Sequence, residues 1–268
     1  MLFRARVSLS VEGAVADVRL TSPDRRNALD RDMFCALADC IAAVRASKAR
    51  VAVISGEGPA FCAGLDRAMF GQMLSGDAPD GIPADLVERT HDDCNLPQHV
   101  VLGWQNMPIP VIAAIHGAAL GGGLQLALGA DIRFVAPDAR LALLEIRWGL
   151  VPDMAAIAIL PSCVRDDVLR DLLYSGRIVR GDEAVRIGLA TYLAADPLEA
   201  ALIYARDVAT RSPSAIHAAK RLANTRSLDR SAVLLRESIE QQQLIGGDDQ
   251  RSAAAAAMNA DAKSKGIS

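Results

Sequence analysis

Three successive glycines, Gly121–Gly123, stand between two apolar runs, Pro110–Ile115 and Leu126–Leu128. The order of these segments predicts a buried strand, a glycine turn and the start of a buried helix. The first backbone N–H groups of a helix have no partner within the helix, and they lie at its positive end. Such groups can bind a phosphate, or they can hold a negative charge that develops on an oxygen during a reaction.

Taken alone, these glycines leave more than one use open. No Lys-Ser/Thr pair follows them, which excludes a Walker A loop. A dinucleotide-binding fingerprint is incomplete, because Leu126 occupies the third glycine position. A turn that needs left-handed backbone angles, or close packing of a helix on a strand, also explains the glycines.

The best candidate for an acid or a base is Glu145, which follows the apolar run Leu141–Leu144. We predict this run to be a strand. A carboxylate at the end of an apolar strand is unusual, and a general acid or base must face the reacting atoms. The alternative is a glutamate at the edge of the sheet that faces solvent.

The composition limits the kinds of protein that this chain can be. Of its 268 residues 51% are hydrophobic and 4% aromatic, so a large core must be built from Ala, Leu, Val and Ile. A net charge of −3 argues against a nucleic acid partner. The five cysteines form no Cys-x-x-Cys motif, which favours reduced thiols in a cytoplasmic protein without a disulfide framework or a metal site.

One segment has the composition of a membrane span, because residues 98–130 contain no Asp, Glu, Lys or Arg. Pro108, Pro110 and the glycine cluster would break a helix there and leave backbone groups unsatisfied in lipid. The N-terminus lacks the long apolar stretch of a signal peptide. We therefore expect a cytoplasmic protein without a membrane partner.

Strands alternate with helices through residues 1–195, which predicts an α/β layered core. After that the sequence shows helical patterns alone, and we predict that residues 196–268 form a helical region that packs on a neighbouring subunit. The expected elements are a hairpin over 5–11 and 15–20, a helix over 30–47, a strand over 51–54, a loop with helical pieces over 75–100, strands over 132–135 and 141–144, and helices over 163–175, 181–188, 197–211, 213–224 and 228–244.

Four blocks of the sequence together resemble the enoyl-CoA hydratase/isomerase family, also called the crotonase family. The blocks are Phe61–Asp66, Ala118–Gly123 with Ala130–Arg133, Leu144–Pro152, and Tyr174–Arg177. The resemblance implies a core of repeated ββα units with a C-terminal helical region, and a homotrimer or a dimer of trimers. It also implies acyl-CoA thioesters as substrates, with coenzyme A as part of the substrate and no metal, nicotinamide or flavin.

The resemblance further implies roles for single residues. The backbone N–H groups of Leu65 and Gly122 would form an oxyanion hole, and Glu145 would carry the proton. The second glutamate of the hydratases falls at Gln125, whose amide can hydrogen-bond a water but cannot take its proton. Asp153 matches an acid of the dienoyl-CoA isomerases, or it is the N-cap of a helix over residues 154–160.

The loops that meet coenzyme A in the family are matched less clearly. The residues expected to contact it are Arg25, Arg26, Ala28, Ala63, Asp66 and Lys263. The sequence therefore predicts an enzyme that shifts the double bond of an enoyl-CoA or hydrates it, and Gln125 favours the shift. The alternative, which Gln125 also permits, is an acyl-CoA-binding protein that has lost turnover.

Overall fold

The structure is a computed structural model, and it describes residues 1–74 and 86–225 together with residues 239, 241, 243, 247, 248 and 252. Its centre is a seven-stranded mixed sheet in the order β1-β2-β3-β4-β5-β7-β10. The β1–β2 and β2–β3 pairs are antiparallel, and the strands from β3 to β10 run parallel to one another. These strands are β1 Leu2–Phe3, β2 Val7–Glu12, β3 Val15–Leu20, β4 Val51–Gly56, β5 Val111–Ile115, β7 Ile132–Val135 and β10 Tyr192–Leu193.

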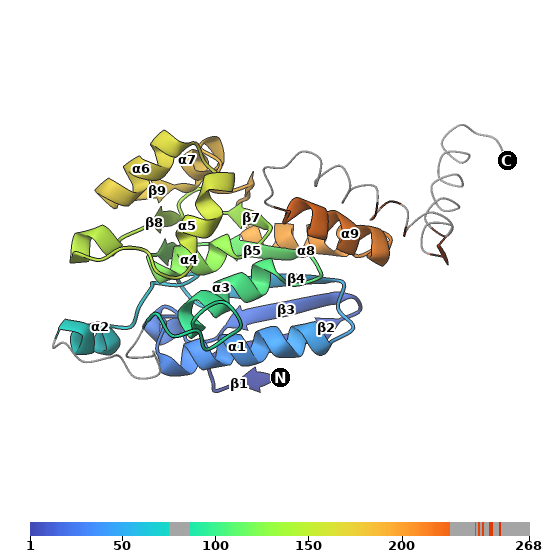
Figure 1. The fold of residues 1–268 in the computed structure, drawn as a ribbon, viewed down its shortest axis with the longest axis horizontal. Helices are drawn as coiled ribbons and strands as arrows, with labels where there is room; N and C mark the ends of the chain where they lie inside the picture. Colours follow the sequence, from blue (N-terminus) through green and yellow to red (C-terminus); the bar gives the residue numbers. More distant parts are fainter. Residues whose placement is uncertain are drawn as a thin grey trace.

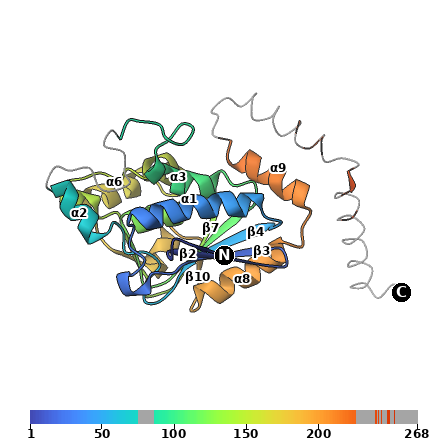
Figure 2. The ribbon, with the colours of Figure 1, turned by 90° about the horizontal axis from the view of Figure 1, so that it is seen from below.

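Helices cover both faces of this sheet (Figures 1 and 2). On one face lie α1 (Arg31–Ala46) and α3 (Leu96–Gln105), and on the other lies α8 (Pro197–Val208). Side chains alternate along β4, so Val51 and Val53 pack toward α8 while Ala52 and Ile54 pack toward α1 and α3. A strand buried on both faces reads as a continuous apolar run, which is why the sequence of β4 identified it.

A second, three-stranded sheet carries the glycine cluster into position. It consists of β6 (Ala118–Leu120), β8 (Arg140–Ala142) and β9 (Val179–Arg180), with β6 parallel and β9 antiparallel to β8. The strand β6 was not predicted, because three residues are too few to show a period. The glycines therefore follow a strand of the second sheet, and α4 (Gly122–Leu128) begins directly after it.

Several predicted bounds need correction. The strand predicted over 141–144 spans Arg140–Ala142, and Glu145 begins a short 3-10 helix, Glu145–Trp148, so its carboxylate is not at a strand end. Of the loop with helical pieces predicted over 75–100, residues 75–85 lie outside the described residues, and its end contains the start of α3. The remaining helices are α2 Arg67–Leu74, α5 Ala156–Ile159, α6 Asp166–Ser175, α7 Gly181–Arg186 and α9 Pro213–Ala223.

The C-terminal region begins with α8 and α9, as predicted, but α8 packs on the main sheet and forms part of the core. Most of the helix predicted over 228–244 lies outside the described residues, and so does Lys263. The division of the chain at residue 195 stays a prediction. Within the described residues, no helix is both long enough and apolar enough to cross a bilayer.

Candidate active site

Two loops that are far apart in sequence meet beside the glycine cluster. Cys62 forms a parallel bridge with Ala119: its N–H donates to Ala118 O over 2.9 Å, and Leu120 N–H donates to Cys62 O over 3.1 Å. Gly64 has a φ of +93°, and a Cβ at this position would lie 2.6 Å from Leu120 O and 3.8 Å from the Gly122 nitrogen. Only glycine fits such a backbone at such a distance, so Gly64 sets how closely the two loops approach.

The backbone N–H groups of Leu65 and Gly122 are both available at this junction. Leu65 pairs with Leu29 in a parallel bridge. Leu29 N–H donates to Gly64 O at 2.8 Å and Asp66 N–H donates to Leu29 O at 3.0 Å, so the bridge does not use the Leu65 N–H. Gly122 is the first residue of α4, so its N–H has no partner within the helix. In the described part of the chain, no protein group accepts a hydrogen bond from either N–H.

Gln125 lies on α4 and connects this junction to the candidate acid or base. Its side chain is buried, with 1% of the residue exposed. Its Nε2 donates to Glu145 Oε1 over 2.8 Å, while its Oε1 accepts from Met154 N–H at 2.9 Å and Ala156 N–H at 3.4 Å. The two backbone donors fix the amide orientation, because a flipped amide would point its NH2 at two N–H groups. Gln125 therefore directs its nitrogen, and not its oxygen, toward Glu145.

Glu145 has one oxygen bound and one free. Its Oε1 accepts from Gln125, whereas Oε2 is buried and has no hydrogen-bond partner among the described residues. Burial raises the pKa of Glu145; the hydrogen bond from Gln125 opposes that rise, and the negative charge of Asp153 adds to it. This arrangement suits a carboxylate that exchanges a proton with a bound molecule.

Asp153 lies in the loop before α5 and is not its N-cap. The residue before α5 is Ala155, with a left-handed backbone, and no side chain caps the helix, so the predicted capping role is wrong. Desolvation raises the pKa of Asp153 as well. The charge of Asp153 contributes to the raised pKa of Glu145, and a shared role for the two carboxylates in one site stays a prediction.

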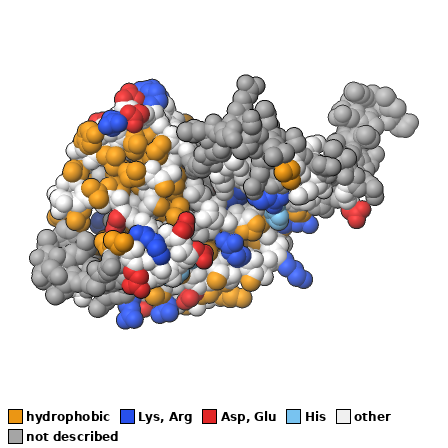
Figure 3. Space-filling model, in the orientation of Figure 1, with side chains coloured by type: hydrophobic (Ala, Val, Ile, Leu, Met, Phe, Trp, Pro, Cys, Tyr) orange, Lys and Arg blue, Asp and Glu red, His pale blue; other side chains and the backbone are white. Residues whose placement is uncertain are grey.

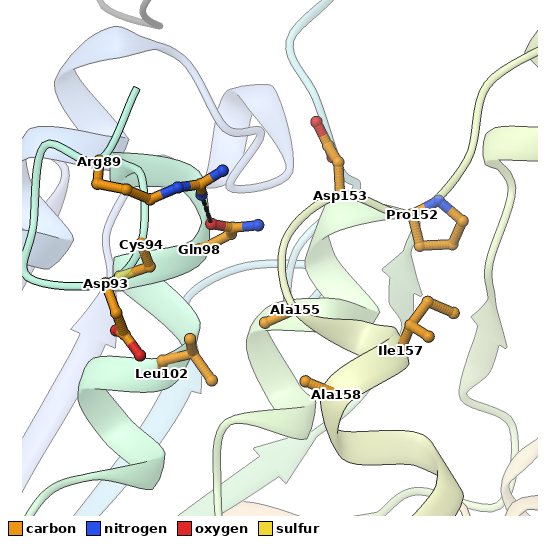
Figure 4. A pocket seen from close by; sticks show the side chains of 10 residues that line it. All are labelled: Arg89, Asp93, Cys94, Gln98, Leu102, Pro152, Asp153, Ala155, Ile157 and Ala158. Carbon is orange, nitrogen blue, oxygen red and sulfur yellow. Dashed lines mark hydrogen bonds between the residues drawn. The ribbon is translucent and has the colours of Figure 1, made fainter. Parts of the chain in front are cut away.

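Asp153 also lies on the rim of a groove between α3 and α5 (Figure 4). The groove has a volume of about 310 Å³ and is open to solvent. One wall comes from α3 and the loop before it, and the other from α5 and the loop before it. The lining residues are Arg89, Asp93, Cys94, Gln98, Leu102, Pro152, Asp153, Ala155, Ile157 and Ala158.

Most of the residues predicted to contact coenzyme A lie together at the N-terminal end of α1. Arg25 forms ion pairs with Asp30 at 2.7 Å and Asp66 at 2.6 Å, and Ala63 N–H donates to Arg26 O at 3.0 Å. In the same loop, the Ala28 N–H donates to Arg25 O at 3.1 Å. The 22–28 and 60–66 loops therefore form one surface, although the charges of Arg25 and Asp66 are already paired with each other.

The sequence analysis missed Asn27, which holds these loops together. It is fully buried with a φ of +55°. Its Oδ1 accepts from Ser22 N–H at 2.9 Å, and its Nδ2 donates to Glu57 O and Ala60 O at 3.0 and 2.8 Å. Asparagine tolerates left-handed backbone angles and forms hydrogen bonds with the backbone of turns. Its place in a predicted loop, directly after two arginines, is the sequence signal that could have identified it.

Comparisons with known proteins identify the family to which this chain is similar. Residues 10–251 match the family model for enoyl-CoA hydratase/isomerase. The mitochondrial Delta(3,5)-Delta(2,4)-dienoyl-CoA isomerase of Mus musculus is 31% identical over 217 residues. The matched part covers 79% of this chain and 66% of that relative, so the chain spans just under two thirds of the relative's length. The "probable enoyl-CoA hydratase echA6" of Mycobacterium bovis is 34% identical over 218 residues, covering 81% of this chain and 82% of that relative.

A solved structure agrees with the fold over almost the whole chain. A Streptomyces coelicolor A3(2) protein named "putative enoyl-CoA hydratase" superposes with a TM-score of 0.85 at 34% identity, covering 95% of this chain and 91% of that one. The likeness confirms the predicted α/β fold, which in this chain contains two mixed sheets. Among the described residues, no group of His, Cys, Asp and Glu side chains is arranged to hold a metal ion.

Proposed function

Because the chain belongs to the enoyl-CoA hydratase/isomerase (crotonase) family, we propose that it moves a carbon–carbon double bond within an enoyl-CoA thioester, without a separate cofactor. The observation that carries this proposal is the contact of Gln125 with Glu145. The position that would need a second carboxylate to activate water holds an amide, and that amide donates to Glu145. A second carboxylate, Asp153, lies instead on the rim of the adjoining groove.

The proposed reaction begins with the thioester oxygen at the N–H groups of Leu65 and Gly122. Glu145 removes a proton from C2 through its free Oε2, and the electron pair moves onto the thioester oxygen. The two N–H donors stabilise this enolate, and removal of one such donor costs about 10²–10³-fold in turnover in other oxyanion holes. Gly122 suits the role because a Cβ there would lie 2.8 Å from Leu29 Cδ1 and 2.9 Å from Met154 Sδ.

The second half of the reaction uses Asp153. As the electron pair returns to the carbon chain, Asp153 delivers a proton to a carbon farther from the thioester, and the double bond is then conjugated with the carbonyl. One proton leaves C2 and one is added, so the mass of the substrate is unchanged. Glu145 and Asp153 exchange their proton through solvent, because the groove beside Asp153 is open. Raised pKa values suit both groups, since each alternates between acid and base near neutral pH.

Hydration is the second candidate, and the names of relatives favour it as much as isomerisation. We place it second because both lone-pair directions of the Gln125 oxygen are taken by Met154 N–H and Ala156 N–H. A water beside Glu145 therefore meets one carboxylate and an amide NH2, and only the carboxylate can accept its proton.

We further propose that the chain assembles with copies of itself, as a trimer or a dimer of trimers. Large apolar side chains lie exposed around the turn that carries Glu145, and Figure 3 shows apolar surface over this part of the molecule. Patches of this kind mark interaction surfaces. The exposed side chains are Ile146, Trp148, Leu150, Val151, Ile157, Tyr174 and Ile178. Light scattering on the wild type and on Val151→Glu tests this: a single monomeric mass for the wild type contradicts it.

The proposed reaction is tested by incubating the protein with 3-enoyl-CoA, 3,5-dienoyl-CoA and 2-enoyl-CoA and separating the products by mass and retention time. Isomerisation changes the retention and not the mass, whereas hydration adds the mass of one water. We expect isomerised products from the first two substrates. Hydration of 2-enoyl-CoA as the main activity contradicts the proposal, and a protein that binds all three without turnover contradicts both candidates.

A further inference from the structure

The groove between α3 and α5 has one wall that is built to donate hydrogen bonds. Its centre is Gln98, the third residue of α3, whose side chain closes a capping box with Asn95. The Gln98 Oε1 accepts from Asn95 N–H at 3.1 Å and from Arg89 Nη1 at 2.9 Å. Two donors hold this oxygen, so the amide orientation is fixed and the NH2 group is left to point elsewhere.

The free donors of this wall face the groove. Figure 4 shows the Gln98 nitrogen directed across the groove, toward the wall that carries Asp153, with the Arg89 guanidinium beside it. Arg89 has five N–H donors, and its contact with Gln98 uses one of them. Gln98 is half-buried, which makes a hydrogen bond to it worth more than one at an open surface.

The other lining residues restrict what these donors can bind. Asp93 offsets the positive charge of Arg89, and Asp153 adds a negative charge whenever it is ionised, so the groove has no excess positive charge to hold an anion. Leu102, Ala155 and Ala158 leave room for a carbon chain between the polar groups. A ligand that fits has an apolar chain and an uncharged oxygen that accepts hydrogen bonds.

We propose that this groove selects enoyl-CoA substrates whose acyl chain carries a neutral acceptor oxygen, a hydroxyl or a carbonyl, beyond the reacting double bond. The inference rests on the proposed function, because the groove receives the acyl chain only if Glu145 and Asp153 act on it. Gln98 Nε2 and the Arg89 guanidinium donate to that oxygen. A plain alkyl chain leaves both donors without an acceptor, which lowers its kcat/KM.

The test compares three 3-enoyl-CoA series of matched chain length that end in a methyl group, a hydroxyl group or a carboxylate, each made short, medium and long. For the chain length that reaches the groove, we expect kcat/KM of the hydroxyl substrate to exceed that of the methyl substrate about tenfold, the usual scale of one hydrogen bond. We expect the carboxylate substrate to be no better than the hydroxyl substrate.

The key variant is Gln98→Glu. A glutamate still offers an oxygen that accepts from Asn95 N–H and from Arg89, so the capping box and the fold are preserved. It has no NH2 group, so the donor that faces the groove is removed. Because a substrate hydroxyl could donate to the new carboxylate, this variant is assayed with a terminal ketone, which accepts only and which the wild type should also prefer over the methyl substrate. Gln98→Glu should abolish the preference for the ketone, and Arg89→Met should reduce it in part. The control is Arg186→Met, an exposed arginine on α7 that should change neither value.

A methyl substrate as good as the hydroxyl substrate at every length overturns the proposal, and so does a preference that survives in Gln98→Glu. A carboxylate substrate that is clearly best overturns the assignment to a neutral oxygen. If no series is isomerised, the proposed function fails. Calorimetric binding of the corresponding saturated acyl-CoAs then tests the proposed selectivity of the groove without turnover. Tighter binding of the hydroxyl compound than of the methyl compound supports it, and equal affinities contradict it.

Discussion

Asp131 and Glu145 are both carboxylates whose pKa is raised by desolvation, although the Asp131 side chain is still 26% exposed. Asp131 has an ion-pair partner: its Oδ2 accepts from Lys220 Nζ at 2.7 Å and from Val111 N–H at 2.7 Å. Lys220 in turn donates to Ile109 O at 2.8 Å. Glu145 receives one side-chain donor, from Gln125, and keeps a buried oxygen without a partner among the described residues.

The difference separates a carboxylate used for structure from one available for chemistry. The pair of Asp131 and Lys220 fastens α9 to the residue that precedes β7, and the side chain of Lys220 is only 7% exposed. An unpartnered buried oxygen such as Glu145 Oε2 costs stability and persists where function needs it. We therefore expect substitutions at Asp131 and Lys220 to affect stability, and substitutions around Glu145 to affect turnover.

The largest effect should come from Glu145→Gln, which preserves the shape of the side chain and removes its base. We expect turnover to fall by about 10²–10⁴-fold, the scale of a lost general acid or base. Acyl-CoA affinity measured by calorimetry should change little, because Glu145 faces the reacting carbons. Glu12→Gln, on an exposed strand end, is the matched control. A variant that keeps most of its rate shows that another group carries the proton.

The next largest effect should come from Lys220→Met, which leaves Asp131 without its cation. Breaking a buried pair costs about 3–5 kcal/mol, and since the Asp131 side chain is 26% exposed we expect the lower end of that range, about 3 kcal/mol of unfolding free energy. Urea denaturation measures the loss, with exposed Lys48→Met as the control. The double variant with Asp131→Asn should lose less than the sum of both single variants. Unchanged stability, or a large loss of kcat, contradicts the structural role assigned to Asp131 and Lys220.

A smaller effect should come from Gln125→Leu, which removes the donor to Glu145 at similar volume. The Gln125 hydrogen bond lowers the pKa of Glu145, so its loss raises that pKa further. If Glu145 must be ionised to act, the acid limb of kcat/KM against pH should move to higher pH. We also expect about a tenfold loss of kcat at neutral pH with little change in KM. A purely structural role would lower stability and leave the pH profile in place.

Asp153→Asn should move the acid limb of kcat/KM against pH to lower pH, opposite to the shift expected for Gln125→Leu. The charge of Asp153 raises the pKa of Glu145, so removing it lowers that pKa, and activity should persist to lower pH. The maximal rate should still fall, because an amide cannot deliver the second proton. Profiles of both variants in one buffer series test the pair of predictions together. A shift of Asp153→Asn toward higher pH contradicts the proposed site.

Much of the fold could be predicted from the sequence where the pattern is local. The alternation of β2 and β3 and the apolar run of β4 identified their strands, and the helical spacing of α1 placed it within one residue at each end. The strand β6 was missed because three residues carry no period. A helix cap was one of two alternatives for Asp153, because an aspartate before an apolar run satisfies the capping pattern; the backbone instead turns at Ala155 and α5 starts later.

By itself, the sequence determined which residues can do the chemistry: a glycine cluster at a helix start, a carboxylate after an apolar run, and a glutamine in place of a second acid. Only the tertiary structure decided how they are oriented. Gln125 and Glu145 are 20 positions apart, and Met154 is 29 positions from Gln125, so no local pattern relates the three. The direction of the Gln125 amide depends on two backbone N–H groups that the fold brings beneath it, because an amide side chain has no preferred direction until its partners are in place.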